Sequence, residues 1–339
     1  MANPTRFGSF KGVDIFEVEL VSDASAVARI MTYGAALRDF QVPSKAGSQR
    51  VVLGYEQFDH YPAHSPYFGA TCGPVANRIA HGRFTIDGMT YQLDLNQNGE
   101  HTLHSGKDNL GRRPWTIMTH DRRSVTLATV SEDGDMGFPG RLVASCTYTL
   151  MEPATLRVEM RATTDKATPI NFAHHSYFNL DGSADVLEQR LQVHADLRTV
   201  TDAALIPTGE IVAVAGSPWD FREDRPIRFD TPDGPHKYDG NFVLRSAGPL
   251  AHAATAWSPK SGVTLECWTT EPGLQFYDGA KLNSPVPGLG GALYGARAGF
   301  ALEAQRFPDA VNHAHFLGGV TRPGEVYHQI TEYRFGQKG

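Results

Sequence analysis

Short stretches in which apolar and polar residues alternate run along most of the chain, separated by glycine, proline and aspartate. The segment RFTIDGMTYQLDL (83–95) predicts two strands joined by an Asp-Gly turn, a strong signal for a hairpin. The same alternation recurs in SVTLATVSEDG (124–134) and through RLVASCTYTLMEPATLRVEMRATT (141–164). Three further segments, 262–270, 274–279 and 327–335, have a similar pattern. Because successive side chains of a strand point to opposite faces, these segments predict strands with one buried face.

Helical periodicity is nearly absent. The segment 183–196 comes closest, but its apolar residues fit a single helical face poorly; they are Val186, Leu187, Leu191 and Val193. Many short strands with regularly spaced turns are typical of an all-β sandwich or barrel. We therefore expect an all-β fold.

One stretch has the composition of a linker. Residues 216–240 are rich in Pro, Gly and Asp, yet they include large apolar side chains, namely Trp219, Phe221, Ile227 and Phe229. We interpret the stretch as a packed loop, of the kind that often carries a site on a β scaffold. We expect a single domain over residues 1–339.

Composition narrows the class of protein. Of the 339 residues, 41% are hydrophobic and 20% charged, and the net charge is -6, which favours neither nucleic acid nor an anionic membrane as a partner. No apolar run is long enough to span a bilayer, and the start MANPTRFGSFKGVDIF has no signal-peptide core. Cys72, Cys146 and Cys267 are odd in number and far apart, so we expect reduced thiols in a cytoplasmic protein and no zinc site.

Two adjacent histidines stand in the aromatic stretch NFAHHSYFNL (171–180). If this stretch is a strand, His174 shares a face with Ile170, Phe172 and Phe178, whereas His175 shares the other face with polar groups that include Tyr177. Hydrogen-bonding groups beside aromatic rings suit a hydroxylated ligand such as a sugar. Both histidines could equally be structural, because a titratable group marks a site only probabilistically.

Glu303 stands in the apolar stretch GFALEAQ (299–305). A carboxylate is rarely buried unless it is paired or functional. Burial would raise its pKa and make it a better base near neutral pH. The alternative is an ordinary carboxylate that faces water at the edge of a strand.

Nine blocks in one order carry a resemblance to a known family over nearly the whole chain. They are GPVANRIAHGRF (73–84), HTLHSG (101–106), GFPG (137–140), INFAHHSYFNL (170–180), LIPTGE (205–210), SPWDFR (217–222), YDGNFVL (238–244), PGLQFYDG (272–279) and ALEAQRFPDAVN (301–312). Together they resemble the aldose 1-epimerases, or galactose mutarotases. The resemblance implies a single large antiparallel β-sandwich that interconverts the α and β anomers of a free aldose, with no cofactor and no metal.

The resemblance also implies roles for particular residues. Glu303 would be the general base and His175 the general acid, a carboxylate and an imidazolium on either side of the anomeric carbon. The implied substrate contacts are Asn77, Arg78, His104, Asp239 and Gln275, with Tyr177 as a weaker candidate. We expect a monosaccharide such as D-galactose or D-glucose as the substrate, no nucleic-acid or membrane partner, and a monomer or homodimer.

The chain departs from the family pattern at four positions. His174 stands where Asn is usual, Pro74 where Arg is common, Ser105 in place of Gly, and Gly240 in place of His. None coincides with the implied acid or base. We expect Pro74 and Gly240 to affect sugar preference if they lie beside the substrate hydroxyls.

Three other functions remain open. An epimerase of hexose 6-phosphates would need a basic phosphate cradle, for which Arg112 and Arg113 are the candidates. A glycoside hydrolase would use Asp239 and Glu303 as its two carboxylates. A non-catalytic sugar-binding protein on the same fold would need neither the acid nor the base.

Overall fold

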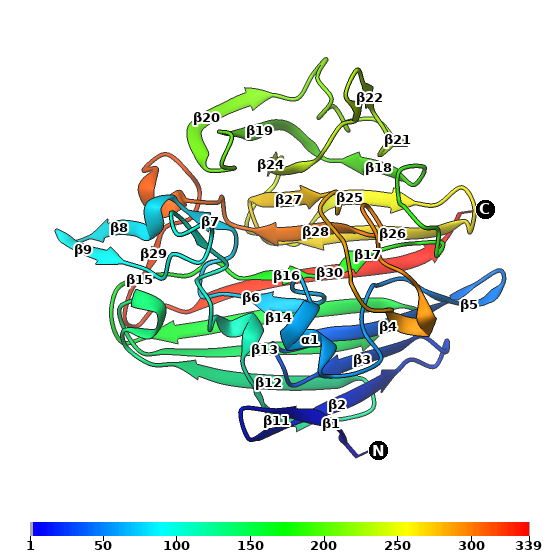
Figure 1. Cartoon of the computed structure of the whole chain (residues 1–339), viewed down its shortest axis with the longest axis horizontal. Helices are drawn as coiled ribbons and strands as arrows, with labels where there is room; N and C mark the ends of the chain where they lie inside the picture. The colour runs from blue at the N-terminus through cyan, green and yellow to red at the C-terminus, as the bar shows by residue number, and fades with distance from the viewer. Residues whose placement is uncertain (1–2, 339) are drawn as a thin grey trace.

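The computed structural model describes residues 3–338, and antiparallel strands dominate it. The widest sheet has nine strands, in the order β11 (Thr116–His120), β12 (Ser124–Ser131), β13 (Leu142–Met151), β14 (Thr155–Thr164), β30 (Tyr327–Gln337), β26 (Val263–Thr269), β25 (Ala251–Trp257), β18 (Arg190–Val193) and β21 (Arg225–Pro226). In Figure 1, β30 crosses the middle of the molecule in red, and β14, β13 and β12 follow one another below it.

Two further sheets pack on the nine-stranded sheet. The five-stranded sheet holds β1 (Thr5–Phe10), β2 (Val13–Val21), β3 (Val27–Met31), β4 (Ala36–Ser44) and β5 (Gly47–Arg50). The six-stranded sheet has the order β17 (Tyr177–Phe178), β28 (Phe300–Gln305), β27 (Gly273–Tyr277), β24 (Asp239–Leu244), β19 (Ala195–Thr201) and β20 (Pro207–Ala213). A bridge between Val52 and Phe178 links the segment after β5 to β17. The two sheets thus form one layer that faces the nine-stranded layer.

Short pairs and turns complete the fold. The paired strands are β6 (Ala70–Cys72) with β16 (Ala173–His175), β7 (Arg78–Ile79) with β10 (Thr102–Leu103), β8 (Arg83–Ile86) with β9 (Met89–Gln92), β15 (Thr168–Pro169) with β29 (Val320–Thr321), and β22 (Asp230–Thr231) with β23 (Gly234–Pro235). The helical segments are α1 (His60–His64), η1 (Ala80–Gly82), η2 (Leu110–Arg112), η3 (Asp135–Gly137), η4 (Leu289–Gly291) and η5 (Ala310–Asn312). None of the helices between residues 3 and 338 is long and apolar enough to cross a membrane.

The main core lies between the two layers. Its side chains include Ile30 and Phe40 from the five-stranded sheet, Tyr148 from β13, and Phe276 and Leu302 from the six-stranded sheet. Strands β13 and β14 alternate buried and more exposed residues along most of their length, as their sequence pattern predicts. The prediction of a large antiparallel β-sandwich is confirmed.

Individual strand predictions also hold. The hairpin at 83–95 is β8 and β9, and the turn residues Asp87 and Gly88 have φ values of 50° and 80°, the left-handed values that a tight hairpin turn needs. The segment 183–196 is not helical and contains β18. In the stretch 216–240, Trp219, Phe221 and Ile227 are buried as expected for a packed loop, whereas Phe229 is 39% exposed.

Strand β28 carries the residue pattern that places Glu303. All six of its residues are buried, because both of its faces are covered. Phe300, Leu302 and Ala304 join the main core, so Ala301, Glu303 and Gln305 must point to the opposite face. The apolar sequence around Glu303 therefore reflects a strand inside the sheet, and the alternative of a carboxylate facing water is wrong.

Candidate active site

A cleft of about 190 Å³ opens on the face of the six-stranded sheet to which Glu303 points. Its walls come from segments far apart in the sequence. The residues that line it are Pro66, Tyr67, Asn77, Arg78, Leu103, His104, His175, Tyr177, Asp239, Tyr277, Lys281 and Glu303. All the sequence-predicted site residues except Gln275 are among them.

His175 and Glu303 face each other in this cleft. Nε2 of His175 lies 3.5 Å from Oε1 of Glu303, and the two residues are 5% and 2% exposed. Nδ1 of His175 and Oε2 of Glu303 are buried and have no hydrogen-bond partner within residues 3–338. The imidazole ring stacks with that of Tyr177 at a centroid distance of 5.0 Å, which orients it towards the carboxyl group.

Burial moves the pKa values of this pair in opposite directions. It raises the pKa of Glu303 well above its usual value, helped by the negative charge of Asp239 and opposed by Arg78. It lowers the pKa of His175 to about 4. A low-dielectric environment penalises whichever form is charged. At neutral pH the free protein therefore holds a neutral imidazole, which differs from the imidazolium expected from the sequence.

The other histidine of the pair lies in the core. Nε2 of His174 is 2.7 Å from the hydroxyl oxygen of Ser176, and Nδ1 is 3.3 Å from that of Tyr148. Its ring also contacts Tyr333, and burial lowers its pKa to about 3. His174 thus has hydrogen-bond partners on both ring nitrogens and is absent from the cleft lining, as the alternation along the strand predicts.

Asn77 and His104 hold each other in place. The amide of Asn77 donates to Nδ1 of His104 at 3.1 Å, and the amide of His104 donates to the carbonyl of Asn77 at 2.8 Å. Their φ values are 61° and 48°, which are uncommon outside glycine and typical of functional sites. Burial and the nearby His175 and Arg78 lower the pKa of His104 well below its usual value, so its ring is neutral. Since Nδ1 accepts a hydrogen bond, the ring proton is on Nε2.

Three acceptors hold the guanidinium of Arg78. Nε donates to Oε1 of Gln97 at 2.9 Å, and Nη1 to Oδ1 of Asn77 at 3.5 Å. Nη2 lies 3.6 Å from Oδ2 of Asp239. Gln275, which does not line the cleft, donates from its side-chain amide to Oδ1 of Asp239 at 2.6 Å. The carboxylate of Asp239 is therefore anchored beside the cleft by two groups.

Several lining residues are not among the candidates that the sequence predicts. Tyr67 lies in an irregular segment, at a φ of 69°, and its ring contacts that of His104 at a centroid distance of 4.6 Å. Tyr277 is the last residue of β27, and Lys281 lies in the loop that follows it. Lys281 is an exposed cation.

None of the four departures from the family pattern lines the cleft. A Cβ atom on Gly240 would lie 2.6 Å from the Trp219 ring, so this residue faces the packed side of the sheet. Neither Gly240 nor Pro74 lines the cleft, so the condition under which they would affect sugar preference is not met. Ser105 has a φ of 72°, a left-handed backbone conformation that favours glycine. Its hydroxyl stabilises this conformation by accepting a hydrogen bond from the amide of Val75 and donating one to the carbonyl of Val75.

The two arginines considered for a phosphate cradle lie outside the cleft lining. The guanidinium of Arg112 packs on the ring of Tyr67 at 4.6 Å. Arg113 bonds the carbonyl of Asp108 and the carboxylate of Asp135. Neither is arranged to hold a phosphate in the cleft.

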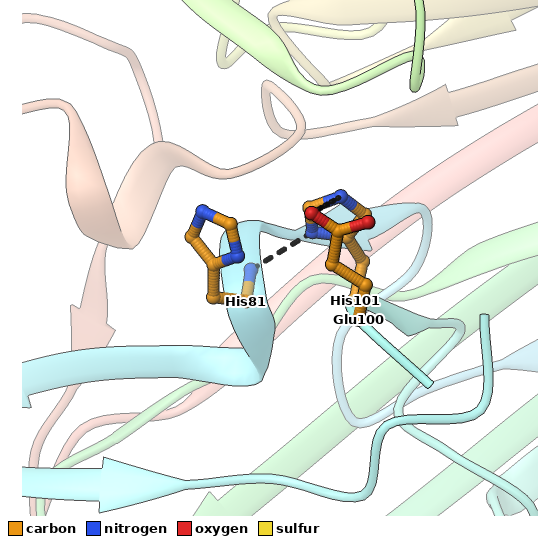
Figure 2. A group of neighbouring side chains, drawn as sticks. All are labelled: His81, Glu100 and His101. Carbon is orange, nitrogen blue, oxygen red and sulfur yellow. Dashed lines mark hydrogen bonds and ion pairs between the residues drawn. The ribbon is translucent and has the colours of Figure 1, made fainter. Parts of the chain in front are cut away.

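Within residues 3–338, one group of His and Glu side chains has donor atoms close enough to suggest a metal site, and Figure 2 shows it. The atoms of His81, Glu100 and His101 lie within 4.8 Å of one another. The backbone amide of His81 donates to Nδ1 of His101 at 3.0 Å, so Nδ1 is an acceptor and Nε2, which faces Glu100 at 3.7 Å, carries a proton. Nε2 then has no free lone pair for a metal. The cluster instead ties η1 to the segment before β10.

Comparison with known proteins agrees with this fold. The aldose 1-epimerase family model matches residues 17–334. Galactose mutarotase of Bos taurus is 38% identical over 316 residues, which cover 90% of each chain. Aldose 1-epimerase of Escherichia coli K12 is 38% identical over 326 residues, which cover 93% of this chain and 94% of the relative.

Solved structures show the same similarity. An aldose epimerase homologue from C. elegans superimposes with a TM-score of 0.90 at 31% identity, over 95% of this chain and 99% of that one. Galactose 1-epimerase from Lactobacillus acidophilus gives a TM-score of 0.84 at 25% identity, over 99% of each chain. The fold and these matches define a carbohydrate epimerase. The chain belongs to the aldose 1-epimerase family, and its function is that of an aldose 1-epimerase.

Proposed function

We propose that the protein equilibrates the α and β anomers of D-galactose or D-glucose, with Glu303 as the general base and His175 as the general acid. The observation that carries this proposal is the apposition of Nε2 of His175 and Oε1 of Glu303 at 3.5 Å in a sugar-sized cleft. Ring opening removes a proton from the C1 hydroxyl and adds one to the ring oxygen. Both oxygens are bonded to C1, so an acid and a base this close together can serve both.

One proton shared by the pair is enough for a complete cycle. With the carboxylate of Glu303 and a protonated His175, Glu303 takes the proton of the C1 hydroxyl, the bond between C1 and the ring oxygen breaks, and His175 gives its proton to that oxygen. The open-chain aldehyde rotates about the C1–C2 bond. The groups then exchange roles: the acid form of Glu303 protonates the aldehyde oxygen, and His175 removes the proton of the C5 hydroxyl. Only protons move, so the cycle calls for no cofactor and no metal.

The pKa directions fit this proton count. Burial favours the state in which Glu303 is protonated and His175 is neutral, which is the state that follows ring opening. Opening of the cyclic sugar starts from the opposite state, in which the proton is on His175 and Glu303 is a carboxylate. The pair thus titrates as a unit, and activity requires that it hold one proton.

The remaining polar groups would bind the sugar hydroxyls. We assign these contacts to Asn77, Arg78, His104, Asp239 and Tyr177, with the Nε2 proton of His104 as a donor. Gln275 was expected to contact the substrate, and its bond to Oδ1 of Asp239 supports a role in orienting that carboxylate.

Polarimetry of a freshly dissolved pure anomer tests the proposal. We expect faster equilibration with α-D-galactose or α-D-glucose, unaffected by EDTA, and no cleavage of a nitrophenyl galactoside. Equilibration of the 6-phosphates alone would favour the phosphorylated alternative. Binding of the sugar without faster equilibration would favour the non-catalytic one.

We also propose a cytoplasmic monomer or homodimer that acts without nucleic acid. The support is limited to the net charge of -6 and to three buried cysteines, all with free thiols. Light scattering of the purified chain would decide the oligomeric state.

A further inference from the structure

Three polar side chains stand in a row across the strands behind the cleft. The register pairs Asn241 of β24 with Gln275 of β27, and Gln275 with Glu303 of β28. Directly opposite residues of antiparallel strands point to the same face, so all three point to the face that carries the cleft.

A third amide lies beyond Glu303 on the same face. Gln305 follows Glu303 by two positions in β28 and is paired with Gly273. A Cβ atom on Gly273 would lie 2.5 Å from Oδ1 of Asn241, which shows that the amide of Asn241 lies over this glycine. Gly273, which has no side chain, therefore leaves space on this face between Asn241 and the strand that carries Glu303 and Gln305.

These two amides have no protein partners. Asn241 and Gln305 are 1% and 0% exposed, and within residues 3–338 the oxygen and nitrogen of each side-chain amide lack a hydrogen bond, as does Oε2 of Glu303. The neighbouring Gln275 and the buried Gln329 differ, because they donate to Asp239 and to the carbonyl of Ala304. Leaving a buried polar group unsatisfied costs about 1–3 kcal/mol, so such groups are nearly always paired with protein or with ordered water.

We propose that Asn241 and Gln305 bind ordered water that donates a hydrogen bond to Oε2 of Glu303, which makes both amides positioning residues for the base. The amides offer both donors and acceptors, and a buried water needs two to four such partners. A hydrogen bond donated to a carboxylate stabilises its charged form. The water thus offsets part of the burial that otherwise keeps Glu303 protonated. This inference rests on the proposed role of Glu303.

Other titratable groups lie close enough to Glu303 to interact with it electrostatically, and they define the background for a test. They are His175 on β16, Cys72 on β6, Asp239 on β24, Arg78 on β7, Tyr177 on β17 and Tyr333 on β30. The test variants leave all of them unchanged.

The substitutions Gln305→Met and Asn241→Leu remove the amides at similar volume. Because burial puts the pKa of Glu303 above that of His175, the alkaline limb of the kcat/KM profile reports Glu303. In each variant we expect that limb to move to higher pH by about one unit and the plateau of kcat/KM to fall by about tenfold. KM should change little, since neither amide lines the cleft.

Gln329→Met is the matched control, because it also removes a fully buried amide but one with protein partners. It should lower the melting temperature without moving the alkaline limb. A high-resolution crystal structure of the unchanged protein should show water within hydrogen-bond distance of Oε2 and of both amides.

Overlapping pH profiles for the wild type and both variants, or an Oε2 atom bonded only to protein in the crystal, would overturn the inference. The crystal structure decides the matter if the variants do not fold. Failure of the proposed function is a separate result, because it would show as no faster equilibration by the unchanged protein, or as a Glu303→Gln variant that keeps its activity.

Discussion

The backbone amide of Asn77 donates to Nδ1 of His104, and this single contact determines which nitrogen of that histidine carries the proton. The pKa of His104 is lowered well below its usual value, mainly by burial, so the ring is neutral and its Nε2–H is a donor in the cleft. Both residues have positive φ values, so their two segments are held in a conformation that few side chains adopt. A neutral donor at this position can bind a sugar oxygen without adding charge to the cleft.

His104→Asn tests this reading. Asparagine tolerates the left-handed backbone, and its side-chain oxygen can accept from the amide of Asn77, but it does not extend as far into the cleft. We expect kcat/KM to fall by about 10²-fold, within the range for one positioned catalytic group, with a nearly unchanged melting temperature. Steady-state polarimetry and thermal unfolding measure the two effects. Full activity of the variant would show that His104 does not contribute to the reaction.

Replacing each of the two adjacent histidines should have a different effect on turnover. We expect His175→Asn to lower turnover by about 10²–10⁴-fold, because asparagine cannot take up and return a proton. His174→Asn should leave turnover largely intact, because His174 contacts Tyr148 and Ser176 in the core and not the cleft. Polarimetric turnover of the two purified variants compares them directly. The reverse outcome would contradict both the strand alternation and the proposed acid.

The proposed general base, Glu303, can be tested with a variant of its own. Glu303→Gln keeps the shape of the side chain but cannot accept the proton of the C1 hydroxyl, so we expect a loss of about 10²-fold or more in turnover with normal unfolding. Gln275→Glu is a useful companion, because it adds a carboxylate next to Glu303 in the register without replacing the base. Near-full turnover of a folded Glu303→Gln protein would show that another group is the base.

Local patterns predict much of this site, and long-range packing decides the rest. The alternation at 170–180 separates His174 from His175, and the apolar stretch around Glu303 indicates its burial, because both depend only on position along a strand. The sequence could not place Gly240, since its orientation depends on Trp219, which packs on that face. Tyr67 lies in an irregular segment with no periodicity. The neutral state of His175 follows from burial by residues distant in the sequence.

Because His174 is buried, we expect the unfolding free energy of the protein to fall in acid. Its pKa is lowered from 6.5 to about 3, so at pH 5 the unfolded chain binds a proton at this position and the folded protein does not. The stabilisation is fully present above pH 6.5 and is lost as pH falls towards 3. Between pH 7 and pH 5 this histidine should cost about 2 kcal/mol of unfolding free energy. Urea titrations should show that His174→Asn loses about that much less than the wild type, and equal losses would contradict the assignment.

Glu271 should show the opposite dependence on pH. It is 5% exposed, its Oε2 has no partner within residues 3–338, and burial raises its pKa to about 7 despite the positive charge of Arg306. Below its unfolded value of 4.5 the group is neutral in both states and costs nothing. Between pH 4.5 and 7 the unfolded chain ionises at this position while the folded protein stays protonated, so stability relative to a neutral side chain falls, and the loss is complete once pH has risen through 7.

Glu271→Gln should therefore raise the unfolding free energy at pH 8 by up to about 3 kcal/mol, and by little at pH 4.5. Urea titrations at the two pH values measure the difference. Glu210→Gln is the matched control, since Glu210 is an exposed carboxylate and its replacement should have the same small effect at both pH values. Glu271 lies outside the cleft lining, so the gain in stability should come without loss of epimerase activity. A Glu271→Gln protein that is no more stable than the wild type at pH 8 would mean that the carboxylate finds a partner or water when it ionises.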